Sequence, residues 1–210
     1  MQKTIVTLEE FTKKIQDGLI HPGDCGCVQN GERSWLNYPI SYVQKTALRD
    51  LSSDFVEDDV TFAGGFTHIV SVISSTHLSE LYYPKARLNL WSNFRGKAIL
   101  FRRVLDPEPN MSSKIVQEAL KDIASGEKYS IRELFYYYFR WARKATFHHK
   151  FADIFLKSKR YNVCSGQYII QLRRAGAKDF LKEEPEAWYP ARCVLTPKMK
   201  DIAYYEIKGE

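Results

Sequence analysis

Residues 66–73 place the strongest constraint on the fold, because a histidine is embedded in an otherwise apolar strand pattern. The segment reads FTHIVSVI, and its β-branched residues predict a buried strand followed by a turn at residues 74–76. His68 occupies a position where a hydrophobic residue is expected. Burying an imidazole without a hydrogen-bond partner costs free energy. We therefore expect His68 to meet a polar group on another element.

A second distinctive stretch, residues 161–170, brings a cysteine to the start of a predicted helix. Cys164 lies in a small polar turn, and residues 167–172 supply an apolar stripe with helical spacing. Unpaired N–H groups and the helix dipole at such a position favour a thiolate, which is the nucleophile of cysteine hydrolases. The alternative is that Cys164 is simply a small buried hydrophobic residue, as free cysteines often are.

The length and composition indicate one soluble globular domain. The chain has 210 residues, of which 44% are hydrophobic and 27% charged. No apolar run approaches the ~18 residues of a membrane span, so no transmembrane segment is expected. Residues 1–8 lack the apolar core of a signal peptide, so we expect a cytoplasmic protein.

The four cysteines are expected to be reduced, since no secretion signal is present. Cys25 and Cys27 fit a short strand and lack further ligands at the spacing of a zinc site. His148 and His149 are adjacent, and adjacent residues on a helix point about 100° apart. We therefore expect no metal ion and no cofactor.

The charge pattern does not favour nucleic acid as a partner. The net charge is +6 and the pI about 9.0, but the basic residues are interspersed with 25 acidic ones and form no block. A mildly basic, solvated surface is the expected result.

The remaining pattern predicts mixed helices and strands. Helices are expected from a capping box at Thr7 to Gly18, over residues 40–51 and over residues 112–125. Strands are expected over residues 25–29 and 97–104, and over residues 80–90 with an interruption at Pro84. Residues 54–65 are predicted to be a loop, and the chain after Gly176 to be loop-rich, with a final apolar stretch at residues 202–205. The absence of regular βαβ alternation favours an α+β fold around an antiparallel sheet.

The order of histidine and cysteine leads to a family resemblance. Papain-like enzymes normally carry the cysteine first, whereas the circularly permuted papain-like amidases, the YaeF/YiiX group related to NlpC-type cell-wall peptidases, carry the histidine first. The chain resembles this group along most of its length. The similar elements are the turn at residues 22–24, the strands at 66–70 and 96–102, the segments 127–130 and 162–167, and the Pro-containing tail at 188–197.

The resemblance implies a single domain over residues 1–210, with a papain-like or NlpC-like core in permuted order and an aromatic-rich helical insertion around residues 112–158. It implies that Cys164 attacks an amide or ester carbonyl and that His68 acts as base and then acid, through an acyl-enzyme. The expected substrate is a small-molecule, peptide or lipid-like amide, such as a cell-wall peptide or an N-acyl compound. We assign Asp24, Tyr129 and Ser165 to substrate binding. The aromatic residues between positions 135 and 147 are candidates for an acyl-binding groove.

The third catalytic position departs from the family pattern. The family places an orienting glutamate in an aromatic-Glu-Ala sequence on the strand after the histidine, where this chain reads YYPKA at residues 82–86. We assign Tyr83 to this position, with Glu80 in a shifted register and His77 as alternatives. His77 falls in the predicted turn. If none of them serves, the alternative is a catalytically inactive binding or structural protein that retains the fold.

Overall fold

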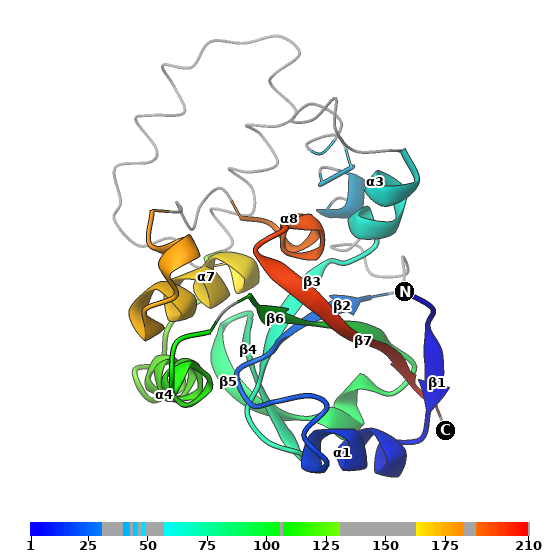
Figure 1. Cartoon of the computed structure of the whole chain (residues 1–210), viewed down its shortest axis with the longest axis horizontal. Helices are drawn as coiled ribbons and strands as arrows, with labels where there is room; N and C mark the ends of the chain where they lie inside the picture. The colour runs from blue at the N-terminus through cyan, green and yellow to red at the C-terminus, as the bar shows by residue number, and fades with distance from the viewer. Residues whose placement is uncertain are drawn as a thin grey trace, which may run out of the picture.

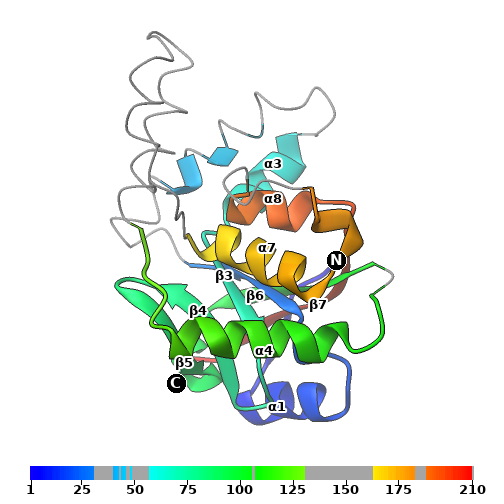
Figure 2. The same ribbon diagram turned by 90° about the vertical axis from the view of Figure 1, so that its left-hand side faces the viewer.

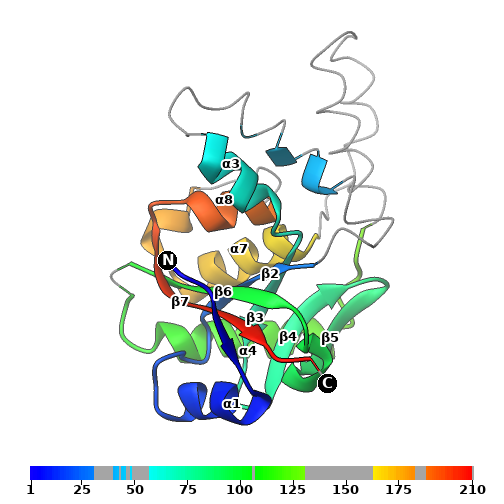
Figure 3. The ribbon, with the colours of Figure 1, turned by 90° about the vertical axis from the view of Figure 1, so that its right-hand side faces the viewer.

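The strands of the described residues form one seven-stranded sheet in the order β1-β7-β6-β2-β3-β4-β5 (Figure 1). The computed structural model describes residues 1–30, 40–42, 44, 45, 48, 57–105, 107–130, 163–182 and 188–209. Neighbouring strands are antiparallel except β1 and β7, which run parallel and lie side by side in Figure 3. The strands are β1 (Thr4–Val6), β2 (Cys25–Gln29), β3 (His68–Val72), β4 (His77–Tyr82), β5 (Lys85–Leu90), β6 (Ala98–Val104) and β7 (Met199–Ile207).

Helices cover both faces of this sheet. The helix α7 lies over β3 with α4 beside it, while α1 lies on the opposite side of the sheet (Figures 1 and 2). The helical elements of the described residues are α1 (Leu8–Gln16), α3 (Glu57–Gly64), α4 (Met111–Ala124), α7 (Cys164–Ala175) and α8 (Pro190–Leu195), with the 3-10 turns η1 (Trp91–Phe94) and η3 (Lys178–Phe180).

The alternation of side chains along the strands divides the core into two clusters. Cys27 of β2 and Ile69 of β3 belong to the cluster that also contains Cys164 of α7. Val28 of β2, the next residue along the chain, belongs to the other cluster with Phe11 of α1. Successive strand residues point to opposite faces, so each face of the sheet is packed against helices.

The helix α1 confirms the predicted capping box. Thr7 Oγ1 accepts the Glu10 N–H at 3.1 Å, and the Glu10 carboxylate accepts the Thr7 N–H at 2.7 Å. Phe11 and Ile15 form the buried face of the helix, at the spacing of four residues that an amphipathic helix requires.

The predicted loop over residues 54–65 is wrong where the structure describes it, because Glu57–Gly64 is the helix α3. The acidic residues 57–59 occupy its first turn, where the helix dipole stabilises negative charge. Val60 and Ala63 are buried. The run of acidic residues therefore marks a helix start rather than a loop.

Two further predictions are corrected at the strands. The single interrupted strand expected over residues 80–90 is the antiparallel hairpin of β4 and β5, with Tyr82 paired to Lys85 across the turn. Proline lacks the N–H that a strand pairing needs, which suits Pro84 to the turn. The tail after Gly176 contains α8 and the nine-residue strand β7, which lies between β1 and β6.

The architecture confirms the expected α+β class, with a mostly antiparallel sheet packed against helices. The described residues between positions 40 and 48 are helical, as predicted. The aromatic segment at residues 135–147 lies outside the described residues, together with residues 131–158 of the predicted insertion.

Candidate active site

Cys164 is the first residue of α7, so its thiol lies at the N-terminal end of that helix. Val163 precedes it as the N-cap and provides no side-chain hydrogen bond to the first turn. The first N–H groups of a helix have no acceptor within the helix. In α7 the first backbone hydrogen bond is the one that the Gln167 N–H donates to the Val163 carbonyl at 2.9 Å. The free N–H groups and the positive end of the helix dipole therefore lie at Cys164.

His68 is the first residue of β3 and is 7% exposed. Its Nε2 lies 2.8 Å from Oε2 of Glu80 on the neighbouring strand β4. The strand register pairs Val70 with Glu80, so the glutamate is a diagonal neighbour of the histidine and within reach of its ring. The side chain of Cys164 is close enough to the imidazole to raise the pKa of His68, through its charge and a side-chain interaction.

Glu80 is a buried carboxylate whose two oxygens are both occupied. The oxygen Oε1 accepts hydrogen bonds from Nε of Arg87 and from Nδ2 of Asn89, each at 2.7 Å, and forms an ion pair with Nη2 of Arg87 at 2.7 Å. Both donors come from β5, where Arg87 lies directly opposite Glu80 in the register. The hairpin of β4 and β5 thus fixes the carboxylate that holds the imidazole.

The surrounding charges determine the protonation of this pair. Burial alone would lower the pKa of His68, but the charge of Cys164, the hydrogen bond with it and the contact with Glu80 raise the pKa from 6.5 to about 9. Burial would raise the pKa of Glu80, yet the bonds from His68, Arg87 and Asn89 lower it to about 2. At neutral pH a protonated imidazole therefore faces an ionised carboxylate.

Tyr82, the last residue of β4, borders the site and is 49% exposed. Its ring meets the His68 ring edge-on, with the centroids 5.8 Å apart. The Cζ atom of Arg87 lies 4.6 Å from the centroid of the same tyrosine ring. One aromatic ring thus contacts both the histidine and the arginine that holds Glu80.

The structure places Glu80, rather than Tyr83, beside the imidazole. Tyr83 follows β4 in the hairpin turn and is 57% exposed. Glu80 therefore replaces Tyr83 as our candidate for the third catalytic residue. His77 begins β4 instead of lying in a turn, and its Nδ1 is 2.8 Å from Oγ1 of Thr76.

Asp24, assigned above to substrate binding, lies at the far end of β3 from His68. Its carbonyl accepts the N–H of Val72, about 13 Å along the strand from His68 at the usual rise per residue. The Asp24 carboxylate is buried and accepts two hydrogen bonds of 2.7 Å from Arg103 and one of 2.8 Å from the N–H of His21. These contacts join β6 to the turn that precedes β2, so the role of Asp24 in this structure is to stabilise the fold.

The other two residues assigned to substrate binding occupy different positions. Ser165 is fully buried and donates a hydrogen bond of 2.8 Å to the Trp188 carbonyl, so its hydroxyl joins α7 to the segment before α8. Tyr129 is half-buried, and its N–H donates to the Pro84 carbonyl at 3.0 Å. Tyr129 therefore lies at the turn of the hairpin that carries Glu80.

A buried carboxylate on α4 holds the helix of the candidate nucleophile in place. Asp122 accepts hydrogen bonds from the side-chain amides of Gln167 and Gln171 on α7, and from Nη1 of Arg174 at 3.2 Å. Ser71 of β3 donates to Oε1 of Gln171 at 3.0 Å. This network joins α4, α7 and β3, the strand that carries the imidazole.

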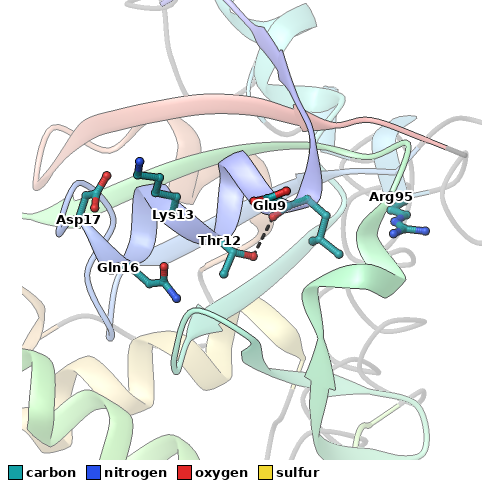
Figure 4. Close-up of a pocket in the computed structure, with 7 residues that line it drawn as sticks. Glu9, Thr12, Lys13, Gln16, Asp17 and Arg95 are labelled. Atoms are coloured by element: carbon teal, nitrogen blue, oxygen red, sulfur yellow. Dashed lines mark hydrogen bonds between the residues drawn. The ribbon is translucent and has the colours of Figure 1, made fainter.

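A separate pocket of about 570 Å³ lies on the outer face of α1 (Figure 4). It is on the opposite side of the sheet from α7, and it includes none of the residues described above as the candidate site (Figure 1). Its walls are mostly exposed polar side chains, so it carries no functional assignment. The lining residues are Leu8, Glu9, Thr12, Lys13, Gln16, Asp17 and Arg95.

Within the described residues, no group of three or more His, Cys, Asp or Glu side chains is arranged to hold a metal ion. His148 and His149 lie outside these residues. None of the helices that the structure describes is both long enough and apolar enough to cross a membrane.

Comparison with known proteins gives no family assignment. No protein-family model matches the chain, and no curated protein shows significant similarity to it. The function is therefore inferred from the geometry of the site and from the resemblance of its motifs.

Proposed function

We propose that this protein is a cysteine hydrolase that cleaves an amide or ester bond through an acyl-enzyme. The position of His68 supports this proposal most strongly, since its Nε2 lies 2.8 Å from the Glu80 carboxylate and its ring is close enough to Cys164 for that side chain to raise the pKa of His68. A nucleophile, a base and a carboxylate that orients the base are the parts of a catalytic triad, which is recognised by geometry rather than by sequence order.

In the first step, the Cys164 thiolate adds to the carbonyl carbon of the substrate and a C–S bond forms. The carbonyl electrons move to the oxygen, and free N–H groups at the start of α7, including that of Cys164, stabilise the oxyanion. Protonated His68 gives its proton to the leaving nitrogen or oxygen as the C–N or C–O bond breaks. The acyl group remains on the sulfur as a thioester.

In the second step, neutral His68 takes a proton from water, whose oxygen attacks the thioester carbon. The C–S bond breaks, the carboxylic acid leaves, and Cys164 returns as a thiolate beside a protonated imidazole. An amine or alcohol in place of water accepts the acyl group, so the same site supports acyl transfer. Glu80 stays ionised throughout and keeps the ring oriented.

The order of the elements supports a circularly permuted papain-like core. His68 on a strand precedes Cys164 on a helix, as in the permuted amidases of the YaeF/YiiX group. In that group the orienting glutamate lies on the strand after the histidine, and here Glu80 lies on β4, the strand after β3. By this resemblance we propose amide substrates, either cell-wall peptides or N-acyl compounds.

The pH dependence of Cys164 alkylation tests the proposal. Iodoacetamide labelling of the folded protein, followed by peptide mass spectrometry, is compared with labelling of the His68→Ala variant. We expect rapid labelling of the wild type that persists well below pH 8.5, about the pKa of an ordinary thiol. Labelling of the histidine variant should slow several-fold near neutral pH, because the imidazolium that stabilises the thiolate is gone.

The matched control is Cys25→Ala, which removes a fully buried thiol from the core cluster of Cys164 and should leave labelling of Cys164 unchanged. A wild-type labelling rate that follows an ordinary thiol, and that is unaffected by the loss of His68, would refute the proposal. That result would favour a binding or structural protein that retains the fold. Rapid, histidine-dependent labelling leads directly to a screen of peptide amides, N-acyl compounds and esters.

A further inference from the structure

The carboxylate of Glu80 has more partners than its pairing with His68 requires. Two nitrogens of Arg87 and one of Asn89 converge on Oε1, each at 2.7 Å, which leaves Oε2 to face His68 Nε2. A carboxylate that is held at one oxygen by two hydrogen bonds and an ion pair cannot rotate without losing these contacts. The direction of Oε2 is therefore set by residues of β5.

Arg87 is itself held in place from two sides. Its Nε donates a hydrogen bond to Glu80 and its Nη2 forms an ion pair with the same oxygen, while its guanidinium lies over Tyr82 with Cζ 4.6 Å from the ring centroid. The same ring meets His68 edge-on at 5.8 Å between centroids. The imidazole, the carboxylate, the guanidinium and the phenol ring thus form a cycle in which each group contacts the next.

Asn89 completes the support from β5. Its Nδ2 donates to Glu80, while its Oδ1 accepts the Leu90 N–H at 2.9 Å and a hydrogen bond from Nδ2 of Asn93. The amide is therefore fixed at both ends. Lys97 also interacts electrostatically with Glu80, but its ammonium lies 4.6 Å from the Phe94 ring centroid and makes no hydrogen bond to the carboxylate among the contacts of the described residues.

We propose that Arg87 is a positioning residue of the active site, which acts through Glu80 to aim the His68 ring at Cys164. This proposal rests on the hydrolase function proposed above. The guanidinium is suited to the role because its planar fork donates two hydrogen bonds in a fixed geometry, whereas a lysine ammonium is a point charge on a flexible chain. Arg87 is half-exposed, so its role does not depend on filling the core.

Charge and position predict opposite effects when Arg87 is removed. If the arginine acts only as a charge, its loss leaves the negative potential of Glu80 less neutralised, stabilises the imidazolium and speeds labelling of Cys164. If it acts by position, the carboxylate turns away from the ring and labelling slows. Lysine keeps the charge but loses the fork, so under the positioning role Arg87→Lys slows labelling as Arg87→Met does.

The experiment measures the second-order rate of Cys164 alkylation by iodoacetamide at pH 6 in the wild type, Arg87→Met and Arg87→Lys. We expect roughly tenfold slower labelling in both variants, the size that loss of hydrogen bonds to a charged group produces. Lys85→Met is the matched control, since it removes one positive charge from the same exposed strand and should label at the wild-type rate. Thermal unfolding midpoints of all four proteins are recorded alongside.

The outcomes separate this proposal from the proposed function. Wild-type labelling that is as slow as that of His68→Ala overturns the hydrolase proposal, and the positioning role with it. A fast wild type with unchanged or faster labelling in Arg87→Lys and Arg87→Met overturns the positioning role alone. Slow labelling that is confined to Arg87→Met shows that a lysine can replace the arginine, so the fixed geometry of the guanidinium is not needed, and this result also overturns the positioning role. If the Arg87 variants unfold at lower temperature but label at the wild-type rate, Arg87 contributes to stability only, and the positioning role is overturned.

Discussion

Ser71 donates a 3.0 Å hydrogen bond to Oε1 of Gln171, and this bond joins the strand that begins with His68 to the helix that begins with Cys164. Gln171 lies about two helical turns beyond the cysteine. Its Nε2 donates in turn to Asp122 on α4 at 2.8 Å. A single buried amide thus connects three elements, and it fixes the separation of the two residues that the proposed chemistry requires.

Replacing Asp122 with asparagine should lower the free energy of unfolding by roughly 2 to 3 kcal/mol. The carboxylate accepts hydrogen bonds from Gln167, Gln171 and Arg174, whereas the nitrogen of an asparagine amide has only hydrogens to offer. Urea unfolding gives the measurement. Asp58→Asn, at an exposed position in the first turn of α3, changes the net charge equally and should cost far less. Equal losses in the two variants would contradict the network.

Cys164 should be the first of the four cysteines that iodoacetamide labels in the folded protein. Burial raises the pKa of Cys25 and of Cys193 well above that of an ordinary thiol, and both side chains, like that of Cys27, are inaccessible. Peptide mapping by mass spectrometry at increasing reaction times gives the order of labelling. If Cys193 were labelled before Cys164, α8 would have to open faster than Cys164 reacts, which would contradict this prediction. Denatured protein provides the control, in which all four cysteines react.

The two residues of the proposed catalytic pair can be singled out from the sequence because each conflicts with its surroundings. His68 is a polar residue in an apolar strand pattern, and Cys164 lies where an apolar run gives way to a helix start. Glu80 shows no such conflict with its sequence neighbours. It begins the segment of residues 80–90, which resembles a single strand interrupted by a proline. Its contact with the imidazole depends on the register of β3 with β4, which tertiary structure determines.

Asp24 and Ser165 illustrate the opposite problem. Both are polar residues within motifs that resemble a known family, and the sequence therefore indicates substrate binding. In the structure each is buried, and its partner is remote in sequence: Arg103 for the aspartate and the Trp188 carbonyl for the serine. A buried polar residue satisfies its hydrogen bonds with whatever the fold brings near, and local pattern does not reveal that partner.

Arg102 should be needed for stability of the C-terminal part of the fold. Arg102→Met is expected to lower the free energy of unfolding by about 3 kcal/mol, since it leaves buried carbonyls without a donor. Arg102→Lys should recover little of this loss, because an ammonium cannot reach divergent acceptors as a guanidinium does. Lys200→Met on the exposed side of β7 is the control, and chemical denaturation is the measurement. Arg102 donates to the carbonyls of Cys193, Thr196 and Met199 and to the carboxylate of Asp201.

The pair of His68 and Glu80 should stabilise the protein most between about pH 4.5 and 6.5. The pKa of Glu80 is lowered from 4.5 to about 2, so its contribution is complete above pH 4.5 and is lost as the pH falls towards 2. The pKa of His68 is raised from 6.5 to about 9, so its contribution is complete below pH 6.5 and is lost as the pH rises through 9. The two windows overlap only between these limits.

The variant Glu80→Gln tests this window directly. Between pH 4.5 and 6.5 it should be less stable than the wild type by on the order of 3 kcal/mol, the size that a shift of this extent implies for a buried group. The difference should shrink towards pH 2, where the wild-type carboxylate also becomes protonated, and again above pH 9, where the imidazole becomes neutral. Glu9→Gln on the exposed face of α1 is the control for loss of one acidic group. A stability difference that stays constant from pH 2 to 9 would contradict the charged pair, because neither protonation of the carboxylate nor loss of the imidazolium charge would then change what Glu80 contributes. The imidazolium that the proposed first step requires would in that case lack its counterion.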